Sequence, residues 1–495
     1  MPGEPRGVSR YVFVAAFCVW LPGCGGKSET IEPPAAVHAD TSQLFASGTR
    51  LKAHYLDGGG GARKLLAFRD SLLDVECQFV ETAARQYACL PTASTRTFSD
   101  SACSAPSIPV ASDCPGAPVP IAGQLISAPS LDCTTQVAAY SLDALQDRAT
   151  EDPSYSLTIH GTCFSPMPQP APSAQWTTKP EPLARFVQGT PSTVGAAGGL
   201  QATRITGDDG AFTTLELVTA GAVCTAITFG EVQRCVPQPL VQTFFYSYTD
   251  ASCTDASVAY VDPTIAERCA GVKPQYLVAS TAADCHVLSA IYALGDPLSR
   301  VFANAGPCAA IDLEGPAYSG DSFYRKGPLV PADVLPLVHS AQIGTGAVTA
   351  LYYADSTSTP ILARGALARS GEWALSDGTQ CTPLEDPSGQ LRCVHHAWLV
   401  GSVDEYADAS CTVPVYTDSL GCASSAIRYI VDTVFDSCSS RLTQTHVAKV
   451  YSGPRYSLQS GSCQLDQYSG PSPFFSLGDP VDASIFPLIS DVVDP

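Results

Sequence analysis

Apolar and polar residues alternate in short runs along this chain, and residues typical of turns separate the runs. The clearest cases are three pairs of runs, each around a turn of Gly, Asp or Ser: 50–55 and 64–68, 202–206 and 212–218, and 349–353 and 361–367. Alternation over five or six residues followed by such a turn is the pattern of a β-hairpin. Each pair is therefore predicted to form two antiparallel strands.

A six-residue motif, aromatic-x-Asp-x-x-Cys, is also written three times, and Ser or Thr follows each copy. The copies lie at 98–103, 248–253 and 406–411. Self-similarity at a nearly constant distance indicates a tandem array. Together with the hairpins, the motif defines three repeats: 46–192, 193–342 and 343–492. No segment has an amphipathic helical period beyond a turn or two, so the predicted fold class is all-β.

Each repeat is predicted to hold two four-stranded units. The opening hairpin and a second hairpin after it make a meander of about 45 to 50 residues, which is the content of one propeller blade. Further strands near 137–142, 287–294 and 447–451 provide the second unit. Two units in each of three repeats predict a six-bladed β-propeller, in which ring closure removes exposed sheet edges. Three separate β domains in a row are the alternative.

Eighteen of the 20 cysteines form three sets of six, one set in each repeat. The sets are Cys77, Cys89, Cys103, Cys114, Cys133, Cys163; Cys224, Cys235, Cys253, Cys269, Cys285, Cys308; and Cys381, Cys393, Cys411, Cys422, Cys438, Cys463. An even number without any C-x-x-C favours disulfides over metal ligands. Six cysteines allow 15 pairings, and the sequence does not decide among them. The hairpin geometry favours first-to-second, third-to-fourth and fifth-to-sixth.

The N-terminus has the features of an export signal. Arg6 and Arg10 precede an apolar run at 11–21, which is too short to span a bilayer. The sequence Leu21-Pro22-Gly23-Cys24 resembles the bacterial lipoprotein signal, in which cleavage before the Cys leaves a thiol that becomes acylated. We therefore expect a signal peptide at 1–23, lipidation of Cys24 and a flexible tether at 24–45. An ordinary secretory signal is the alternative. In bacterial lipoproteins an Asp directly after the Cys favours retention at the inner membrane; here that residue is Gly25, so we expect the outer membrane.

Composition indicates a folded protein, and the net charge argues against nucleic acid as a partner. Hydrophobic residues make up 45% and charged residues only 15%, which is enough apolar content for a packed core. Lys and Arg number 27 against 47 Asp and Glu, so the formal charge is −20. Such a surface repels phosphates, and nucleic acid is not an expected partner.

Few residues suggest chemistry. Asp100, Asp250 and Asp408 of the repeated motif are predicted to cap turns, although one carboxylate per repeat could instead bind calcium or sugar. His395-His396 with Trp398 occurs only in the third repeat. Hydrolase and phosphate-binding motifs are absent. We predict no catalytic residue, no metal and no cofactor, so the protein is not expected to be an enzyme. A pair of glycosidase carboxylates leaves no sequence signal, and an extracytoplasmic enzyme acting on carbohydrate is the alternative.

These motifs together resemble a known group of proteins. The chain is similar to the uncharacterised Cys-rich tandem-repeat lipoproteins of gliding, predatory soil bacteria. The resemblance lies in the lipoprotein signal at Leu21-Pro22-Gly23-Cys24 (the lipobox), the repeated motif, Cys89-Leu90-Pro91, Cys235-Val236-Pro237 and the Gly-x-Cys endings. The third repeat departs from the pattern, with Val394-His395 after Cys393. The resemblance implies a surface location and brings no catalytic residue. The expected function is a cell-envelope lipoprotein, anchored by lipid to the outer membrane, whose scaffold binds a glycan, the cell wall or a protein.

Overall fold

The structure of the chain is a computed structural model. It describes residues 41–495 apart from a set of gaps. These gaps are 84, 110–120, 130–136, 147–154, 158–162, 165–173, 197–198, 230–231, 239, 244–246, 257, 262–274, 284–285, 305–307, 312, 314–321, 365–372, 387, 396–397, 401–404, 418–427, 437–438, 460–461 and 467–473. The predicted signal peptide and most of the predicted tether thus lie outside the described residues.

The fold is all-β, as the alternating pattern predicted. Within the described ranges the helices are four three-residue 3-10 turns: η1 (Thr41–Gln43), η2 (Leu183–Arg185), η3 (Ala332–Val334) and η4 (Ala483–Ile485). In the same part of the chain no helix has the length and apolar character needed to cross a membrane.

Each repeat opens with a meander and ends with a linking strand. The strands of repeat 1 are β2 (Leu51–Asp57), β3 (Arg63–Asp70), β4 (Val75–Ala83), β5 (Gln86–Pro91) and the link β13 (Gln188–Val194). Those of repeat 2 are β14 (Gln201–Gly207), β15 (Phe212–Thr219), β16 (Ala222–Phe229), β17 (Val232–Pro237) and the link β26 (Leu337–Ile343). Those of repeat 3 are β27 (Val348–Ala354), β28 (Pro360–Ala363), β29 (Trp373–Leu375), β30 (Gln380–Glu385), β31 (Leu391–His395) and the link β40 (Leu488–Val493).

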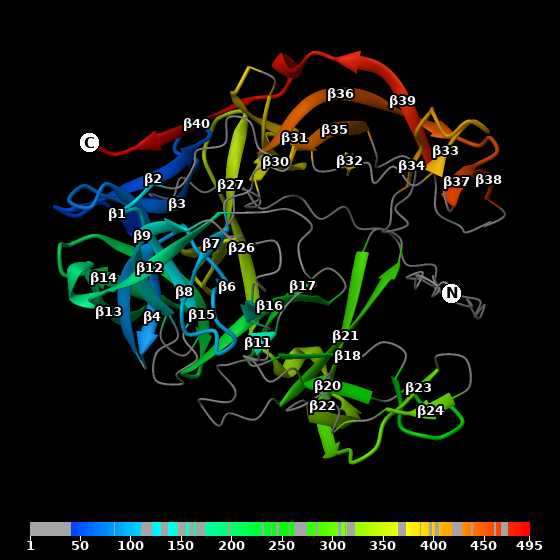
Figure 1. Cartoon of the computed structure of the whole chain (residues 1–495), viewed down its shortest axis with the longest axis horizontal. Helices are drawn as coiled ribbons and strands as arrows, with labels where there is room; N and C mark the ends of the chain where they lie inside the picture. Colours follow the sequence, from blue (N-terminus) through cyan, green and yellow to red (C-terminus); the bar gives the residue numbers. More distant parts are fainter. Residues whose placement is uncertain are drawn as a thin grey trace.

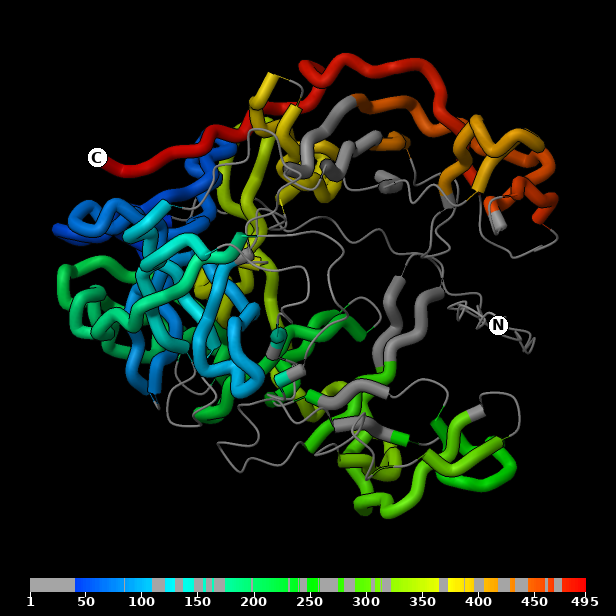
Figure 2. The backbone as a smooth tube through the Cα atoms, in the orientation of Figure 1, coloured from blue at the N-terminus to red at the C-terminus, as the bar shows by residue number. Residues whose placement is uncertain are grey.

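The linking strands join the three meanders into one closed ring of strands. β13 pairs with β5 and with β14, and β26 pairs with β17 and with β27. β40 then pairs with β31 on one side and with β2 on the other. Figures 1 and 2 show this closure, with the red C-terminal strand beside the blue N-terminal strands. All of these pairings are antiparallel, so the central sheet has no open edge at the joins.

Between its meander and its linking strand, each repeat forms two smaller outer sheets. Repeat 1 has β7 (Ile108–Pro109), β12 (Gln175–Glu181), β9 (Val137–Gln146) and β8 (Leu125–Pro129), then β11 (Cys163–Phe164), β10 (Tyr155–Leu157) and β6 (Thr97–Phe98). Repeat 2 has β18 (Leu240–Thr243), β20 (Val258–Val261), β25 (Ser322–Leu329), β22 (His286–Pro297) and β21 (Tyr276–Ala283), which close on themselves, then β19 (Ser247–Tyr248), β23 (Phe302–Asn304) and β24 (Cys308–Ala310). Repeat 3 has β32 (Trp398–Val400), β35 (Tyr429–Asp436), β36 (Ser439–Tyr451), β39 (Phe474–Val481) and β34 (Tyr416–Thr417), then β33 (Glu405–Tyr406), β37 (Tyr456–Gln459) and β38 (Ser462–Leu465).

The pairing does not confirm the six-bladed propeller. Propeller blades are separate sheets around a channel, whereas the three meanders here are hydrogen bonded edge to edge. Nor are the repeats three independent domains in a row, because the linking strands tie each meander to the next. The predicted limits at 192, 342 and 492 fall within the linking strands β13, β26 and β40.

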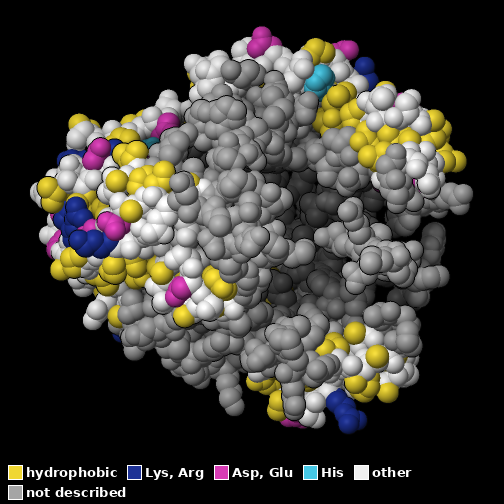
Figure 3. Space-filling model, viewed as in Figure 1, with side chains coloured by type: hydrophobic (Ala, Val, Ile, Leu, Met, Phe, Trp, Pro, Cys, Tyr) yellow, Lys and Arg dark blue, Asp and Glu magenta, His cyan; other side chains and the backbone are white. Residues whose placement is uncertain are grey.

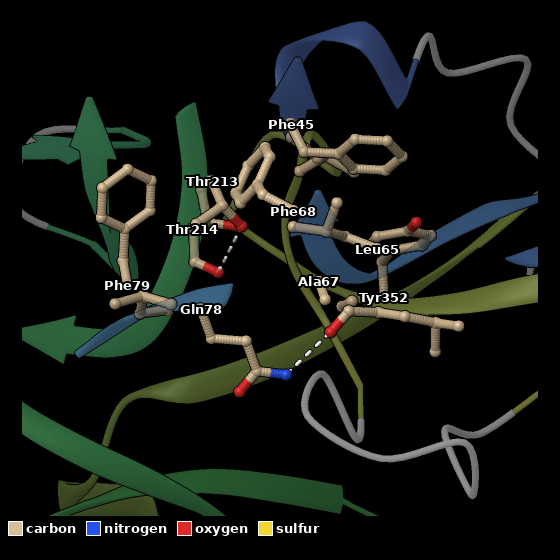
Figure 4. A pocket seen from close by; sticks show the side chains of 13 residues that line it. Phe45, Leu65, Ala67, Phe68, Gln78, Phe79, Thr213, Thr214 and Tyr352 are labelled. Atoms are coloured by element: carbon tan, nitrogen blue, oxygen red, sulfur yellow. Dashed lines mark hydrogen bonds between the residues drawn. The ribbon is translucent and has the colours of Figure 1, made fainter. Parts of the chain in front are cut away.

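The ring encloses a core to which all three repeats contribute. Its largest fully buried side chains include Phe68, Tyr352 and Trp373. Beside Phe68 and Tyr352 a space of about 40 Å³ remains, lined by residues of each repeat (Figure 4). It has room for a few waters at most. The amide of Gln78 in this space donates to Leu66 O at 2.8 Å, so we regard the space as a packing gap within the scaffold rather than a ligand site.

A turn of each repeat forms hydrogen bonds with the backbone of another repeat. In repeat 2, the Asp209 carboxylate accepts hydrogen bonds from the N–H groups of Arg50 and Leu51, at 3.1 and 2.7 Å. In repeat 3, Asp355 accepts from Ala196 N at 3.1 Å. These two turns hold the start of repeat 1 and the segment before β14.

The third contact completes the cycle. The turn between β2 and β3 carries Gly60, whose carbonyl accepts from Thr345 N at 3.1 Å. Nearby, Gly344 has a φ of +120°, and a Cβ there would lie 2.7 Å from the Cβ of Ala62. Only glycine fits this approach and this conformation. A turn of repeat 2 is therefore hydrogen bonded to repeat 1, a turn of repeat 3 to repeat 2, and a turn of repeat 1 to repeat 3.

Candidate functional site

The first disulfide of each repeat matches the hairpin prediction. Cys77–Cys89, Cys224–Cys235 and Cys381–Cys393 each join neighbouring antiparallel strands, with Cα atoms 5.2 to 5.4 Å apart. First-to-second pairing is therefore confirmed in all three repeats. Disulfides of this number indicate an extracytoplasmic location.

The predicted third-to-fourth and fifth-to-sixth pairing is wrong. The third cysteine is joined to the sixth in every repeat: Cys103–Cys163, Cys253–Cys308 and Cys411–Cys463, across 60, 55 and 52 residues. The reason is that the strand before the third cysteine and the strand carrying the sixth belong to one small outer sheet. The fourth and fifth cysteines, namely Cys114, Cys133, Cys269, Cys285, Cys422 and Cys438, lie outside the described residues, as does Cys24.

The repeated aspartates cap turns, in the same way in each repeat. Asp250 accepts from the N–H groups of Thr254 and Asp255, and Asp408 accepts from those of Thr412 and Val413. Asp100 accepts from Ser104 N and Ala105 N, at 2.8 and 2.9 Å. Backbone N–H groups, first those of Thr254 and Val413, hold the pKa of Asp250 and Asp408 well below the usual range. These oxygens are engaged within their own turns, which favours the structural interpretation over a calcium or sugar site.

The cap also holds the third cysteine in an unusual conformation. Cys103, Cys253 and Cys411 have φ values of 51°, 53° and 52°, in the left-handed region. A residue other than glycine rarely adopts this conformation unless its surroundings hold it there. Here the N–H of each cysteine donates to the carbonyl of the aspartate three residues earlier, and its sulfur is fixed by the disulfide. The motif is therefore a disulfide-anchored turn.

The third repeat contains a mixed polar and apolar cleft, which we call the His395 cleft. It has a volume of about 260 Å³ and lies between the central ring and the outer sheet of repeat 3. The turn after β29 contributes Asp377, and the end of β31 contributes His395. β35 begins with Tyr429, which lines the cleft together with Arg428 just before it, and η4 contributes Ile485. The arrangement offers one carboxylate, one guanidinium, one imidazole and apolar walls.

Aromatic packing fixes the floor of the His395 cleft. The ring of Tyr429 meets the ring of Phe486 edge to face, with centroids 5.3 Å apart and planes at 81°. The ring of His395 also packs edge to face against Tyr429, with centroids 6.2 Å apart and planes at 63°. Phe486 is buried, and Tyr429 packs against the apolar cluster that Phe486 forms with Val394 and Val431. Edge-to-face pairs of this kind restrain the orientation of both rings.

The acidic group of the cleft is kept ionised. The Thr379 N–H, 2.9 Å from Asp377 Oδ1, is the main cause that lowers the pKa of Asp377, and the charges of His395 and Arg428 lower it further. Asp377 and Arg428 are both exposed. A carboxylate and a guanidinium are thus presented to solvent on the same cleft.

The imidazole of His395 and the guanidinium of Arg428 are absent from the matching positions of repeats 1 and 2. His395 pairs with the first cysteine of its set, and the residues in that register position elsewhere are Pro91 and Pro237. The carbonyl of Arg428 accepts a hydrogen bond from Ala448 N, and Gln124 and Gln275 occupy the same place in the other two repeats. The sequence signalled His395 but not Arg428, whose equivalence appears only once the strand register is known.

A second cluster lies at the seam that closes the ring. His54 on β2 is nearly buried, and its Nδ1 lies 2.5 Å from Glu76 Oε1 on β4. Its Nε2 is paired with Asp491 on the closing strand β40. The His54 side chain therefore lies between two carboxylates, one on β4 and one on the closing strand. No sequence motif pointed to this cluster, because 437 residues separate His54 from Asp491.

Large apolar side chains are exposed on the outer part of repeat 3. They are Val413, Val447, Val450, Leu458 and Leu465, all at least 40% exposed. In Figure 3 hydrophobic side chains gather at the upper right, where Figure 1 places β33, β37 and β38, whereas Asp and Glu are scattered singly over the described surface of that face. Contiguous apolar patches often mark interaction surfaces.

Comparisons with known proteins add no relative. No family model, no curated protein and no solved structure matches the chain. Over the described residues, no group of three or more His, Cys, Asp or Glu side chains is arranged to hold a metal ion. His396 lies outside these residues.

Proposed function

We propose that the protein is a cell-envelope lipoprotein, anchored through Cys24, whose ring-shaped β scaffold binds a ligand of the envelope or of the cell's surroundings. The anchor rests on the resemblance of Leu21-Pro22-Gly23-Cys24 to a lipobox. The extracytoplasmic location is supported by the disulfides. The resemblance to Cys-rich repeat lipoproteins leads to the same proposal.

One observation carries the binding role. The polar groups that repeat three times, the turn aspartates above all, are occupied in holding the fold together, whereas the His395 cleft departs from the repeat and presents exposed charged groups. A rigid scaffold with one differing cleft suits selective binding, because a preformed site loses little entropy when a ligand binds.

The cleft favours binding over carbohydrate hydrolysis. Glycosidases of the common types need two carboxyl groups on either side of the scissile bond. Asp377 is the single carboxylate among the described residues that line the His395 cleft. Its pKa is lowered, whereas a general acid needs a raised one. These properties support a binding protein rather than an enzyme.

The anchor is tested by lipid labelling of the full chain, expressed in a Gram-negative host with an alkyne-tagged fatty acid. We expect label on the wild type and recovery in the membrane fraction. Cys24→Ala should lose both the label and the membrane association, whereas Cys18→Ala, within the predicted signal peptide, should keep them. An unlabelled wild-type chain, recovered as a secreted protein, would contradict the anchor.

A further inference from the structure

We propose that the His395 cleft binds a single carboxylate-bearing sugar residue of an acidic polysaccharide. This inference rests on the proposed binding function and names its ligand class. The volume of about 260 Å³ lies just below that of typical ligand pockets, which span roughly 300–1,000 Å³. The cleft therefore suits one sugar ring rather than a longer oligosaccharide.

Arg428 is the group that selects for an anionic ligand. Its guanidinium can form a bidentate pair with a carboxylate, which is among the stronger polar contacts in proteins. The other repeats place the uncharged Gln124 and Gln275 at the same backbone position. In a chain whose formal charge is −20, an exposed arginine in a cleft gives an anionic ligand a local attraction.

The remaining groups match the hydroxyl-bearing and apolar faces of a sugar ring. The ionised Asp377 carboxylate accepts hydrogen bonds from hydroxyl groups, and His395 can donate to them from a ring N–H. Ile485 on η4, 57% exposed, adds an apolar side chain to the lining. Small clefts that combine apolar side chains with a few polar groups are typical of ligand sites, in which the polar groups fix the orientation of the ligand.

Isothermal titration calorimetry on the disulfide-bonded chain from residue 25 onward tests the proposal, with tri-galacturonic acid and maltotriose as probes. We expect tri-galacturonic acid to bind and maltotriose to bind at least tenfold more weakly. Arg428→Gln introduces the residue that repeats 1 and 2 have at this position. Loss of a charge-assisted contact of about 1.5–3 kcal/mol should weaken tri-galacturonic acid binding by about 10- to 100-fold.

Arg300→Gln is the matched control, because Arg300 is also an exposed arginine but lies in repeat 2, away from the cleft. It should leave binding unchanged. Absence of tri-galacturonic acid binding, equal binding of maltotriose, or equal binding by Arg428→Gln would each overturn the proposal. Because the chain in this assay has no lipid, these results are independent of the labelling of Cys24. A failed anchor and a failed ligand assignment are therefore distinguishable.

Discussion

The hydrogen bonds between the Asp209 turn of repeat 2 and the start of repeat 1 predict a loss of stability whose size follows from the individual contacts. Asp209 Oδ2 accepts from Arg50 N and Leu51 N, and Oδ1 accepts from Ala211 N at 3.0 Å. The first two bonds cross between repeats and fix the start of β2. Asp209→Ala removes all three acceptor contacts and leaves two N–H groups at the repeat boundary to find water.

The magnitude follows from the number and type of these bonds. A hydrogen bond to a charged group contributes about 1.5–3 kcal/mol, and partial exposure of Asp209 reduces that figure. We expect Asp209→Ala to lower the free energy of unfolding by about 3 kcal/mol. With an unfolding entropy of about 2.1 cal/mol/K per residue, this corresponds to a Tm lower by roughly 3 °C for a chain of this length. Asp209→Asn keeps one acceptor oxygen and should lose about half as much.

Differential scanning calorimetry at pH 7 measures the effect. Asp208→Ala is the matched control, since it makes the same change of charge one residue earlier, at an exposed side chain. It should change stability by less than about 0.5 kcal/mol, as surface substitutions usually do. If Asp209→Ala and Asp208→Ala have the same Tm, the contact between the repeats contributes nothing measurable and the reasoning is refuted.

Three further perturbations test other parts of the scaffold. Replacing both Cys103 and Cys163 by Ser opens a 60-residue loop and should cost about 4 kcal/mol in chemical denaturation, and non-reducing peptide mapping that links Cys103 to another cysteine would disprove the pairing. Burial alone would raise the pKa of Asp386, but hydrogen bonds from Ser388, Gln390 and Arg392 lower it to about 2. Asp386→Asn should therefore lower Tm at pH 6. The difference in Tm between the variant and the wild type should vanish as the pH falls from about 4 to 2. His54→Ala removes the side chain that the Glu76 and Asp491 carboxylates both contact at the seam and should lower the free energy of unfolding by about 1 kcal/mol, because both carboxylates are partly exposed; a second substitution, Asp491→Asn, should restore part of the loss in a thermal melt, and no restoration would argue against this arrangement.

The sequence was sufficient for the strands and for the three repeats, because these depend on local signals. The alternating pattern predicted both ends of β2, β3, β14 and β15 to within two residues. The first disulfide of each repeat was predictable for the same reason, since its cysteines face each other across one hairpin. Asp capping of the repeated turn also depends only on neighbours within five residues.

Long-range pairing was not predictable from the sequence. The choice of Cys163 over Cys114 as the partner of Cys103 depends on β6 and β11 lying in one sheet with β10 between them. Likewise, a meander with free edges satisfies its internal hydrogen bonds equally well as a propeller blade or as a segment of a ring. The linking strands β13 and β40 decide between these, and their partners are set by the tertiary structure.

The threefold repetition of the ring provides an internal comparison that separates scaffold from function. Pro91 and Pro237 occupy the register position of His395, beside the same disulfide and opposite the same cysteine. Proline donates no hydrogen bond and carries no charge, so the ring is built twice at this position without any polar side chain. The ring therefore does not require the imidazole of His395. Because Arg428 stands where the other repeats have glutamine and lines the same cleft, the two departures from the repeat coincide in space, as the ligand site proposed above requires.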